Sequence, residues 1–178
     1  MAGTYNTSLN QIPAIVKKYR DELTGSILNY GCGRGWRKVE HYLFQAGTHI
    51  FPYDKYGDHY LRIPKVGNFD SIICANVLNV CDDDLLKETL ANLQDIMSFN
   101  MHCTLYLSVY EGDRTGKGRV TKKGYQRNQK AAEYETLLNS YFRSVERKGR
   151  NFICSDIHDF ACNEPNDIYT TAQGEIHK

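Results

Sequence analysis

A short apolar strand that runs directly into a glycine-rich turn constrains this chain most. Ser26–Tyr30 has strand length, and Gly31, Gly33 and Gly35 follow it at once. Because glycine has no Cβ and tolerates positive φ, such a turn bends sharply and comes close to a ligand. An amphipathic segment follows over residues 36–46, and the unpaired N–H groups of a helix start point at whatever occupies the turn. Strand, turn and helix in this order predict the nucleotide-binding corner of an α/β sheet.

Strand-like and helix-like segments alternate along the rest of the chain. Apolar side chains at helical spacing predict an N-terminal helix over residues 8–23. Further strands are predicted at residues 48–53, 69–77 and 102–110, and further helices at 85–98, with Asp82, Asp83 and Asp84 at its start, and at 131–141. Residues 145–147 and 151–154 flank a Lys-Gly-Arg turn and predict a hairpin, whereas Gly57, Pro64 and Gly67 interrupt residues 56–68.

These segments predict a Rossmann-like, doubly wound α/β fold with a mostly parallel sheet and a C-terminal antiparallel hairpin. The chain has 178 residues, of which 41% are hydrophobic, enough for one core. We expect one domain over residues 1–154, with an N-terminal helical segment at 1–25, followed by a polar, flexible tail at 155–178. No segment resembles a signal peptide or a membrane span, and the cysteines form no Cys-x-x-Cys pair. A cytoplasmic protein with reduced thiols and no metal site is therefore expected.

An acid stands at the end of the second predicted strand. Asp54 follows residues 48–53, about 20 residues after the glycines, where a carboxylate can hold ribose hydroxyls. A dinucleotide-binding fold prefers its third glycine one position later than Gly35. Segments 27–35, 53–56 and 69–80, in this order, resemble the motifs of class I S-adenosylmethionine (SAM)-dependent methyltransferases.

This resemblance implies that SAM is the cofactor, and it implies roles for individual residues. The glycine turn would support the methionine half of SAM through its backbone, Asp54 would hold the ribose, and Tyr53 or Tyr56 would cover the adenine. Asn76, at the end of the third predicted strand, would face the cofactor or the substrate. The implied cofactor-binding set is Asn29, Tyr30, Gly31, Cys32, Gly33, Gly35, Tyr53, Asp54, Tyr56 and Asn76.

Two positions depart from the pattern of the family. Asn29 stands where the family usually has an acid that helps to hold the ammonium group of SAM, so the charge-assisted part of that contact is lost. The segment 56–68, which in the family supplies adenine contacts, is short. A non-catalytic SAM-binding partner subunit is therefore one alternative to an enzyme.

The substrate end of the site has few distinctive residues. Residues 75–81 lack the Asp/Asn-Pro-Pro-Tyr/Phe box of enzymes that methylate exocyclic amines of nucleic acids. Cys81 lacks the Pro-Cys context of cytosine-C5 methyltransferases, so a semi-buried thiol is expected there. Asn76 and Glu111 are the candidate catalytic residues, Glu111 as the group that orients a nucleophile or accepts its proton. The alternative for Glu111 is an exposed acid that pairs with the basic segment after it.

That basic segment follows the strand predicted at residues 102–110. Residues 114–130 contain seven Lys or Arg and no acid, with glycines interspersed. Residues 112–130 also resemble a segment of small methyltransferases from bacteriophages and bacterial mobile DNA. We expect a mobile loop over the crevice that binds nucleic acid or another phosphate-bearing substrate. The alternative is a small-molecule methyltransferase in which residues 112–130 form a lid. The candidate substrate contacts are Arg119, Lys122, Lys123, Tyr125 and Arg127.

Overall fold

A six-stranded sheet organises the chain in the computed structural model, which describes residues 11–44, 48–56, 68–121 and 124–156. Its strands are β1 (Ser26–Tyr30), β2 (His49–Tyr53), β3 (Ser71–Ala75), β4 (Thr104–Ser108), β7 (Ser144–Lys148) and β8 (Asn151–Ser155). The spatial order is β2-β1-β3-β4-β8-β7. Strands β1 to β4 run parallel, and β8 runs antiparallel to both β4 and β7. The predicted, mostly parallel sheet with a C-terminal antiparallel hairpin is confirmed.

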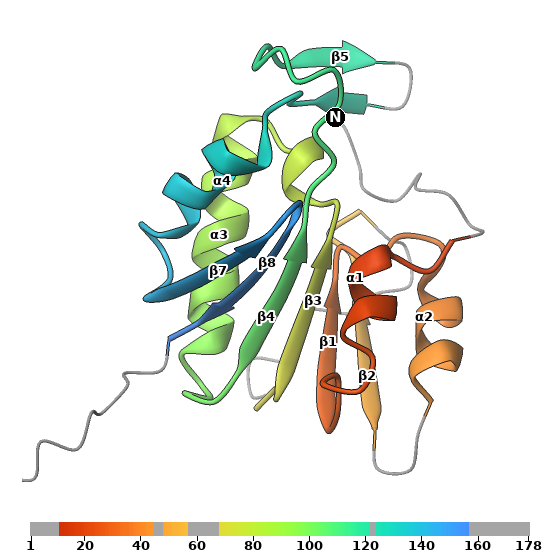
Figure 1. The fold of residues 1–178 in the computed structure, drawn as a ribbon. Coiled ribbons are helices and arrows are strands. Elements are labelled where there is room, and N and C mark those ends of the chain that lie inside the picture. The colour runs from red at the N-terminus through yellow and green to blue at the C-terminus, as the bar shows by residue number, and fades with distance from the viewer. Residues whose placement is uncertain (1–10, 45–47, 57–67, 122–123, 157–178) are drawn as a thin grey trace, which may run out of the picture.

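Helices cover both faces of this sheet (Figure 1). Helices α1 (Ala14–Lys18) and α2 (Trp36–Leu43) pack on one face, and α3 (Asp83–Met97) and α4 (Ala131–Leu138) pack on the other. A short 3-10 helix, η2 (Leu78–Val80), follows β3. Strands β5 (Arg119–Thr121) and β6 (Gly124–Gln126) form a separate hairpin above the carboxyl ends of the parallel strands.

Alternate residues of the central strands enter two different apolar clusters. Ile27 and Ile73 pack with α1 and α2, whereas their neighbours Leu28 and Ile72 pack with α3 and α4. All four side chains are fully buried. Because successive side chains of a strand point to opposite faces, a strand that is apolar throughout serves both layers. The continuous apolar runs in the sequence therefore explain the doubly wound architecture.

The N-terminal helix is shorter than predicted. A helix was expected over residues 8–23, of which residues 8–10 lie outside the described residues. Helix α1 begins only after Pro13, whose ψ of 140° is extended, and it ends before Tyr19. Apolar spacing alone overestimates the helix, because the ring of Pro13 cannot continue a helix toward the N-terminus. Residues 19–23 continue the chain in turns and still bury Tyr19 and Leu23.

Other boundaries differ from the prediction by a few residues. Helix α4 ends at Leu138 rather than at residue 141, and β3 ends at Ala75 rather than at residue 77. Most of the short segment 56–68 and residues 157–178 of the predicted tail lie outside the described residues, so the domain limits 1–154 and 155–178 stay predictions. None of the helices described is both long and apolar enough to cross a membrane.

Asp82 caps the longest of these helices, and its removal should lower stability measurably. Its carboxylate accepts a hydrogen bond from the backbone N–H of Leu85 at 3.0 Å. We expect Asp82→Ala to lower the free energy of unfolding by about 1 kcal/mol, because that N–H loses its partner. Asp84→Ala, which removes a first-turn acid and no cap, should cost only a few tenths of a kcal/mol. Urea denaturation followed by circular dichroism measures both values, and equal losses would contradict the assigned cap.

Candidate active site

The glycine turn after β1 is built from residues in left-handed conformations. Gly31 has φ of +66° and Gly33 has φ of +57°. A Cβ on Gly31 would clash with the side chain of Val77, which lies beyond the end of β3. The N–H of Cys32 donates to the carbonyl of Tyr53 at 3.0 Å. The turn therefore crosses from the end of β1 to the end of β2 in a path that only glycine allows at position 31.

Asp54 fixes this turn from the neighbouring strand. Its side chain is buried, with one carboxylate oxygen accepting from the N–H of Gly33 at 2.9 Å. The other oxygen accepts from the N–H of Tyr56 at 3.0 Å. The predicted acid at the end of β2 is thus joined directly to the glycine turn. Its contact with a ribose stays a prediction.

A crevice of about 640 Å³ opens beside the turn, between α1 and the carboxyl ends of the sheet. This volume lies within the ~300–1,000 Å³ that small-molecule sites usually have. The structure brings five of the residues predicted for the cofactor into its wall, namely Asn29, Gly31, Cys32, Gly35 and Asn76. Other parts of the wall come from residues that the sequence analysis did not single out, among them Lys17, Ser108, Arg150 and Asn151.

Two asparagines of the crevice have unusual environments. Asn29 is 4% exposed, and its side-chain Nδ2 has no hydrogen-bond partner among the residues described. Asn76 has φ of +58°, and its N–H donates to the carbonyl of Ser108 at 2.8 Å. A buried donor without a partner and a strained asparagine are costly to fold, and such features concentrate at binding sites.

The three tyrosines predicted to bind the cofactor, among them the adenine candidates Tyr53 and Tyr56, lie in a second, smaller cavity. Tyr30, Tyr53 and Tyr56 line a space of about 20 Å³ on the α3 side of the sheet. The rings of Tyr30 and Tyr53 pack with their centroids 5.0 Å apart, and burial raises the pKa of both phenols. The space holds about one water molecule. Gly31 lines both cavities and so connects the two parts of the predicted site.

Glu111 binds the start of α4 rather than facing the crevice. One carboxylate oxygen accepts from the N–H of Ala131 at 2.8 Å, and the other pairs with Arg114 at 2.8 Å. The Ala131 N–H and the nearby Arg114 lower the pKa of Glu111, which makes it a weaker base. The structure favours the alternative reading from the sequence, an acid that pairs with the basic segment, because both oxygens are engaged.

The described part of the basic segment contains the two paired strands β5 and β6. Its expected mobility stays a prediction. Asn128 is buried and holds the turn before β5: its Oδ1 accepts from Asp113 N–H at 3.4 Å, and its Nδ2 donates to Lys117 carbonyl at 3.0 Å. Its own carbonyl accepts from Gly116 N–H at 3.0 Å. Lys122 and Lys123 lie outside the described residues.

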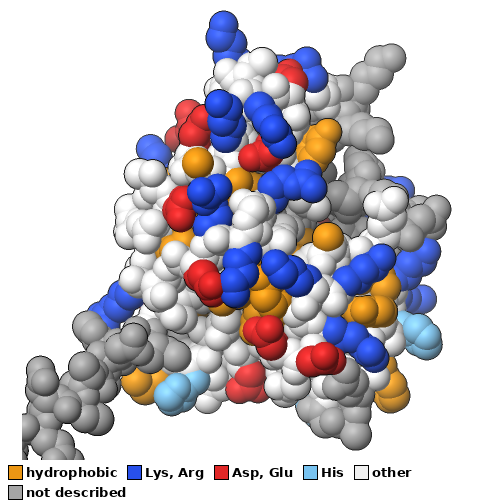
Figure 2. Space-filling model, viewed as in Figure 1, with side chains coloured by type: hydrophobic (Ala, Val, Ile, Leu, Met, Phe, Trp, Pro, Cys, Tyr) orange, Lys and Arg blue, Asp and Glu red, His pale blue; other side chains and the backbone are white. Residues whose placement is uncertain are grey.

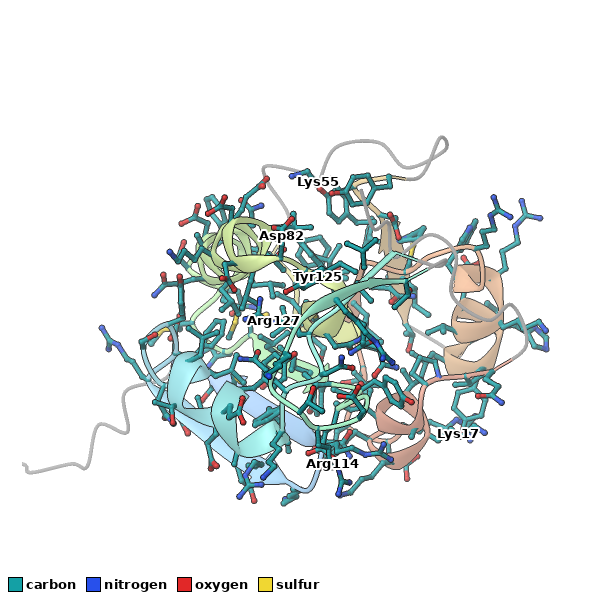
Figure 3. All side chains as sticks on the ribbon, turned by 90° about the horizontal axis from the view of Figure 1, so that it is seen from above. Lys17, Lys55, Asp82, Arg114, Tyr125 and Arg127 are labelled. Atoms are coloured by element: carbon teal, nitrogen blue, oxygen red, sulfur yellow. The ribbon has the colours of Figure 1, made fainter. Side chains whose placement is uncertain are left out.

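Arg127, predicted as a substrate contact, anchors this hairpin to the domain. Its side chain is 10% exposed, and its guanidinium donates to the carbonyl of Cys81 at 3.2 Å and to Asp83 at 2.8 Å. In Figure 3, Arg127 and Tyr125 lie between Asp82 on one side and Arg114 on the other. We therefore assign Arg127 a structural role, because its charge is already paired below the hairpin.

Fewer cations of the hairpin are free to bind phosphate groups than the sequence alone indicated. Arg119 pairs with Asp113 at 3.5 Å, and Tyr125 is half-buried, with its hydroxyl packed against Gly118. Figure 2 shows Lys and Arg side chains over the upper part of the molecule with acidic side chains between them. The surface of this region is therefore mixed rather than uniformly positive.

Asn79 is a structural residue that sequence reasoning missed. It is 3% exposed, its Oδ1 accepts from the N–H of Tyr110 at 3.1 Å, and its carbonyl accepts from the N–H of Arg127 at 2.9 Å. A single asparagine inside an apolar segment gives no signal for such long-range contacts. Asn79 links η2 to the end of β4 and to the hairpin.

Cys81 is a buried thiol, as the sequence analysis expected. It is 1% exposed, and its Sγ donates to the carbonyl of Val77 at 3.3 Å. Burial raises its pKa to about 11. The thiolate, which is the nucleophilic form, is therefore scarce at neutral pH.

Comparison of the fold with solved structures gives clear neighbours. One neighbour is the 1,6-didemethyltoxoflavin-N1-methyltransferase of Burkholderia thailandensis, solved with 1,6-didemethyltoxoflavin and S-adenosylhomocysteine (SAH) bound. It matches with a TM-score of 0.58 and 16% sequence identity, and the match covers 80% of this chain and 77% of the neighbour's chain. The DhpI–SAH complex matches with a TM-score of 0.51 and 14% identity, over 79% and 80% of the two chains. The chain has a class I methyltransferase fold. No family model matches the sequence, and a search of curated proteins gives no match.

This methyltransferase fold depends on a glycine at position 31, which substitution can test. We expect Gly31→Ala to lower the free energy of unfolding by about 2–4 kcal/mol, because left-handed strain and the clash with Val77 add. Gly116→Ala is the matched control, since Gly116 also has positive φ, +71°, but a Cβ there meets no atom within 4 Å. It should cost only about 1 kcal/mol. Chemical denaturation distinguishes the two, and equal values would rule out the contact with Val77.

A second substitution tests the anchoring role of Arg127. We expect Arg127→Met to lower the free energy of unfolding by about 2–4 kcal/mol, because the carbonyl of Cys81 loses a charged donor. Arg119→Met removes a cation whose side chain is 63% exposed and should cost less than about 0.5 kcal/mol. A small effect at Arg127 in thermal or urea unfolding would show that the hairpin is held by other contacts.

Proposed function

We propose that this chain is a SAM-dependent methyltransferase. The observation that carries the proposal is the crevice at the glycine turn, where Asn29 buries an amide donor without a partner. The two structural neighbours with the highest TM-scores given above hold SAH, the product that SAM leaves after methyl transfer. Five of the residues that the sequence motifs imply for SAM meet in one wall of this crevice.

The residues present suit a ligand with the chemistry of SAM. The backbone of Gly31, Cys32 and Gly35 would support its methionine half, and Asn29 and Asn76 would give hydrogen bonds from the floor of the crevice. Asp54 keeps the turn in shape through Gly33. When bound, SAM supplies a methyl group on a positively charged sulfur, ready for in-line displacement. The protein's contribution is to hold the acceptor in line with that methyl group and to exclude water.

The acceptor is better supported as a small molecule than as nucleic acid. Of the basic residues expected to hold phosphates, Arg114, Arg119 and Arg127 pair with acids of this chain. Paired cations contribute less to phosphate binding, because the phosphate must displace an acid that is already bound. Nucleic acid as a partner stays a prediction, which the following experiment tests.

Two measurements test the proposed activity. We expect isothermal titration calorimetry to detect SAM and SAH, with Asn29→Ala weakening both roughly two- to tenfold through loss of one hydrogen bond. Asn139→Ala is the control, because its exposed amide donates to the carbonyl of Glu135 on α4, and Asn139 is not among the residues that line the crevice. Labelled methyl from SAM, supplied to DNA, RNA, protein and small-molecule fractions, should appear in small molecules. Absence of SAM and SAH binding would refute the proposal, and binding without transfer would favour a non-catalytic partner subunit.

A further inference from the structure

The described residues in the wall of the crevice carry positive charge and no negative charge. Lys17 reaches it from α1, and Arg150 reaches it from the turn between β7 and β8. No Asp, Glu or His occurs among the described residues that line it. Lys17 forms no ion pair with any described residue, and Figure 3 shows it on α1, on the same side of the hairpin as Arg114. The crevice is therefore complementary to an anion.

The described residues of the same wall include no group suited to remove a proton. Besides Lys17 and Arg150, its ionisable side chains are Cys32 and Tyr110. Burial, with the nearby Asp54, raises the pKa of Cys32 to about 12, so its thiol keeps its proton. Glu111, the residue after Tyr110, is bound to Ala131 and Arg114, and these groups together with Arg150 lower its pKa, so it is a weak base. An acceptor atom that already has a free electron pair and no proton to lose would need no base here.

The charge of SAM adds a second constraint. SAM carries a net positive charge, because its sulfonium and ammonium groups outnumber its carboxylate, whereas SAH is neutral overall. Asn29, near the end of β1, contributes a neutral amide to the lining of the crevice. Lys17 and Arg150, with no carboxylate among the described lining residues, disfavour a positively charged ligand in a partly enclosed site. An anion bound beside SAM would offset this repulsion.

We infer that the crevice takes a small carboxylate as methyl acceptor, held by Lys17 and Arg150, and that this carboxylate and SAM strengthen each other's binding. The inference rests on the proposed function and specifies its substrate class. The two cations and the lack of a base among the described lining residues both favour a carboxylate, because a carboxylate is an anion and its oxygen is unprotonated at neutral pH.

The reaction then balances without a proton transfer. A carboxylate oxygen forms a bond to the methyl carbon while the carbon–sulfur bond breaks, and the electron pair of that bond stays on sulfur. The carboxylate becomes a neutral methyl ester, and the sulfonium becomes the neutral thioether of SAH. The rate should therefore be nearly constant from roughly pH 6 to pH 9, where carboxylic acids are ionised.

Calorimetry can measure the coupling without any turnover. Benzoate, phenylacetate and succinate would be titrated with SAM or SAH at constant ionic strength, each beside its uncharged amide. We expect at least one carboxylate to tighten SAM binding about fivefold or more and SAH binding much less, with the amides having no effect. Lys17→Ala and Arg150→Ala should each reduce this coupling severalfold. Lys87→Ala, on the exposed face of α3, is the control that should leave it unchanged.

Three outcomes would overturn the inference. If an amide tightens SAM binding as much as its carboxylate does, or if no carboxylate tightens it, the charge of the ligand plays no part in the coupling. If Lys17→Ala and Arg150→Ala lose SAH binding even when no carboxylate is added, the two cations hold the carboxylate of the methionine half of the cofactor instead. Methyl label in a single-stranded oligonucleotide, with none in a methyl ester, would assign the acceptor to nucleic acid. If the wild-type protein binds neither SAM nor SAH, the proposed function itself is refuted, and this outcome is distinct from the three above.

Discussion

The bond between Asp54 and the glycine turn is the contact on which the candidate site depends. Gly31 and Gly33 have left-handed backbone conformations, and a turn with such φ values needs contacts from the surrounding structure to stay in one conformation. The carboxylate of Asp54 supplies that support from the next strand by accepting from the Gly33 N–H. Because β1 and β2 run parallel, their carboxyl ends meet at one edge, and one side chain can span them. The wall of the crevice follows from this cross-strand link.

A second set of contacts joins the hairpin to the same edge of the sheet. Arg127 bonds to the carbonyl of Cys81 and to Asp83 at the start of α3, and Asn79 bonds to both Arg127 and Tyr110. These bonds connect η2, the end of β4 and the hairpin. The sequence of this segment predicts a flexible, basic loop, but the buried side chains of Arg127 and Asn128 attach its described part to the domain.

The sequence predicted the elements of the sheet more accurately than the roles of polar side chains. Continuous apolar runs predicted the central strands, because only a strand buried on both faces needs them. The glycine spacing and Asp54 placed the corner of the site. In contrast, Arg127 was predicted as a substrate contact and Glu111 as a catalytic residue, but tertiary packing decides their partners, which are Cys81, Asp83 and Ala131. Lys17 and Arg150 lie at opposite ends of the described chain, so no local pattern could place them in one crevice.

The position of β8 in the sheet has a consequence for how this chain folds as it is synthesised. β4 pairs with β3 on one side, but its other neighbour, β8, begins more than forty residues later, with Leu107 opposite Phe152 and Leu105 opposite Cys154. Until residues 151–155 leave the ribosome, one edge of β4 has no strand beside it, and an open apolar edge invites pairing with other chains. The central sheet therefore closes only after residues 151–155 have been synthesised, and a chain interrupted before residue 151 would expose an aggregation-prone edge in the middle of its core.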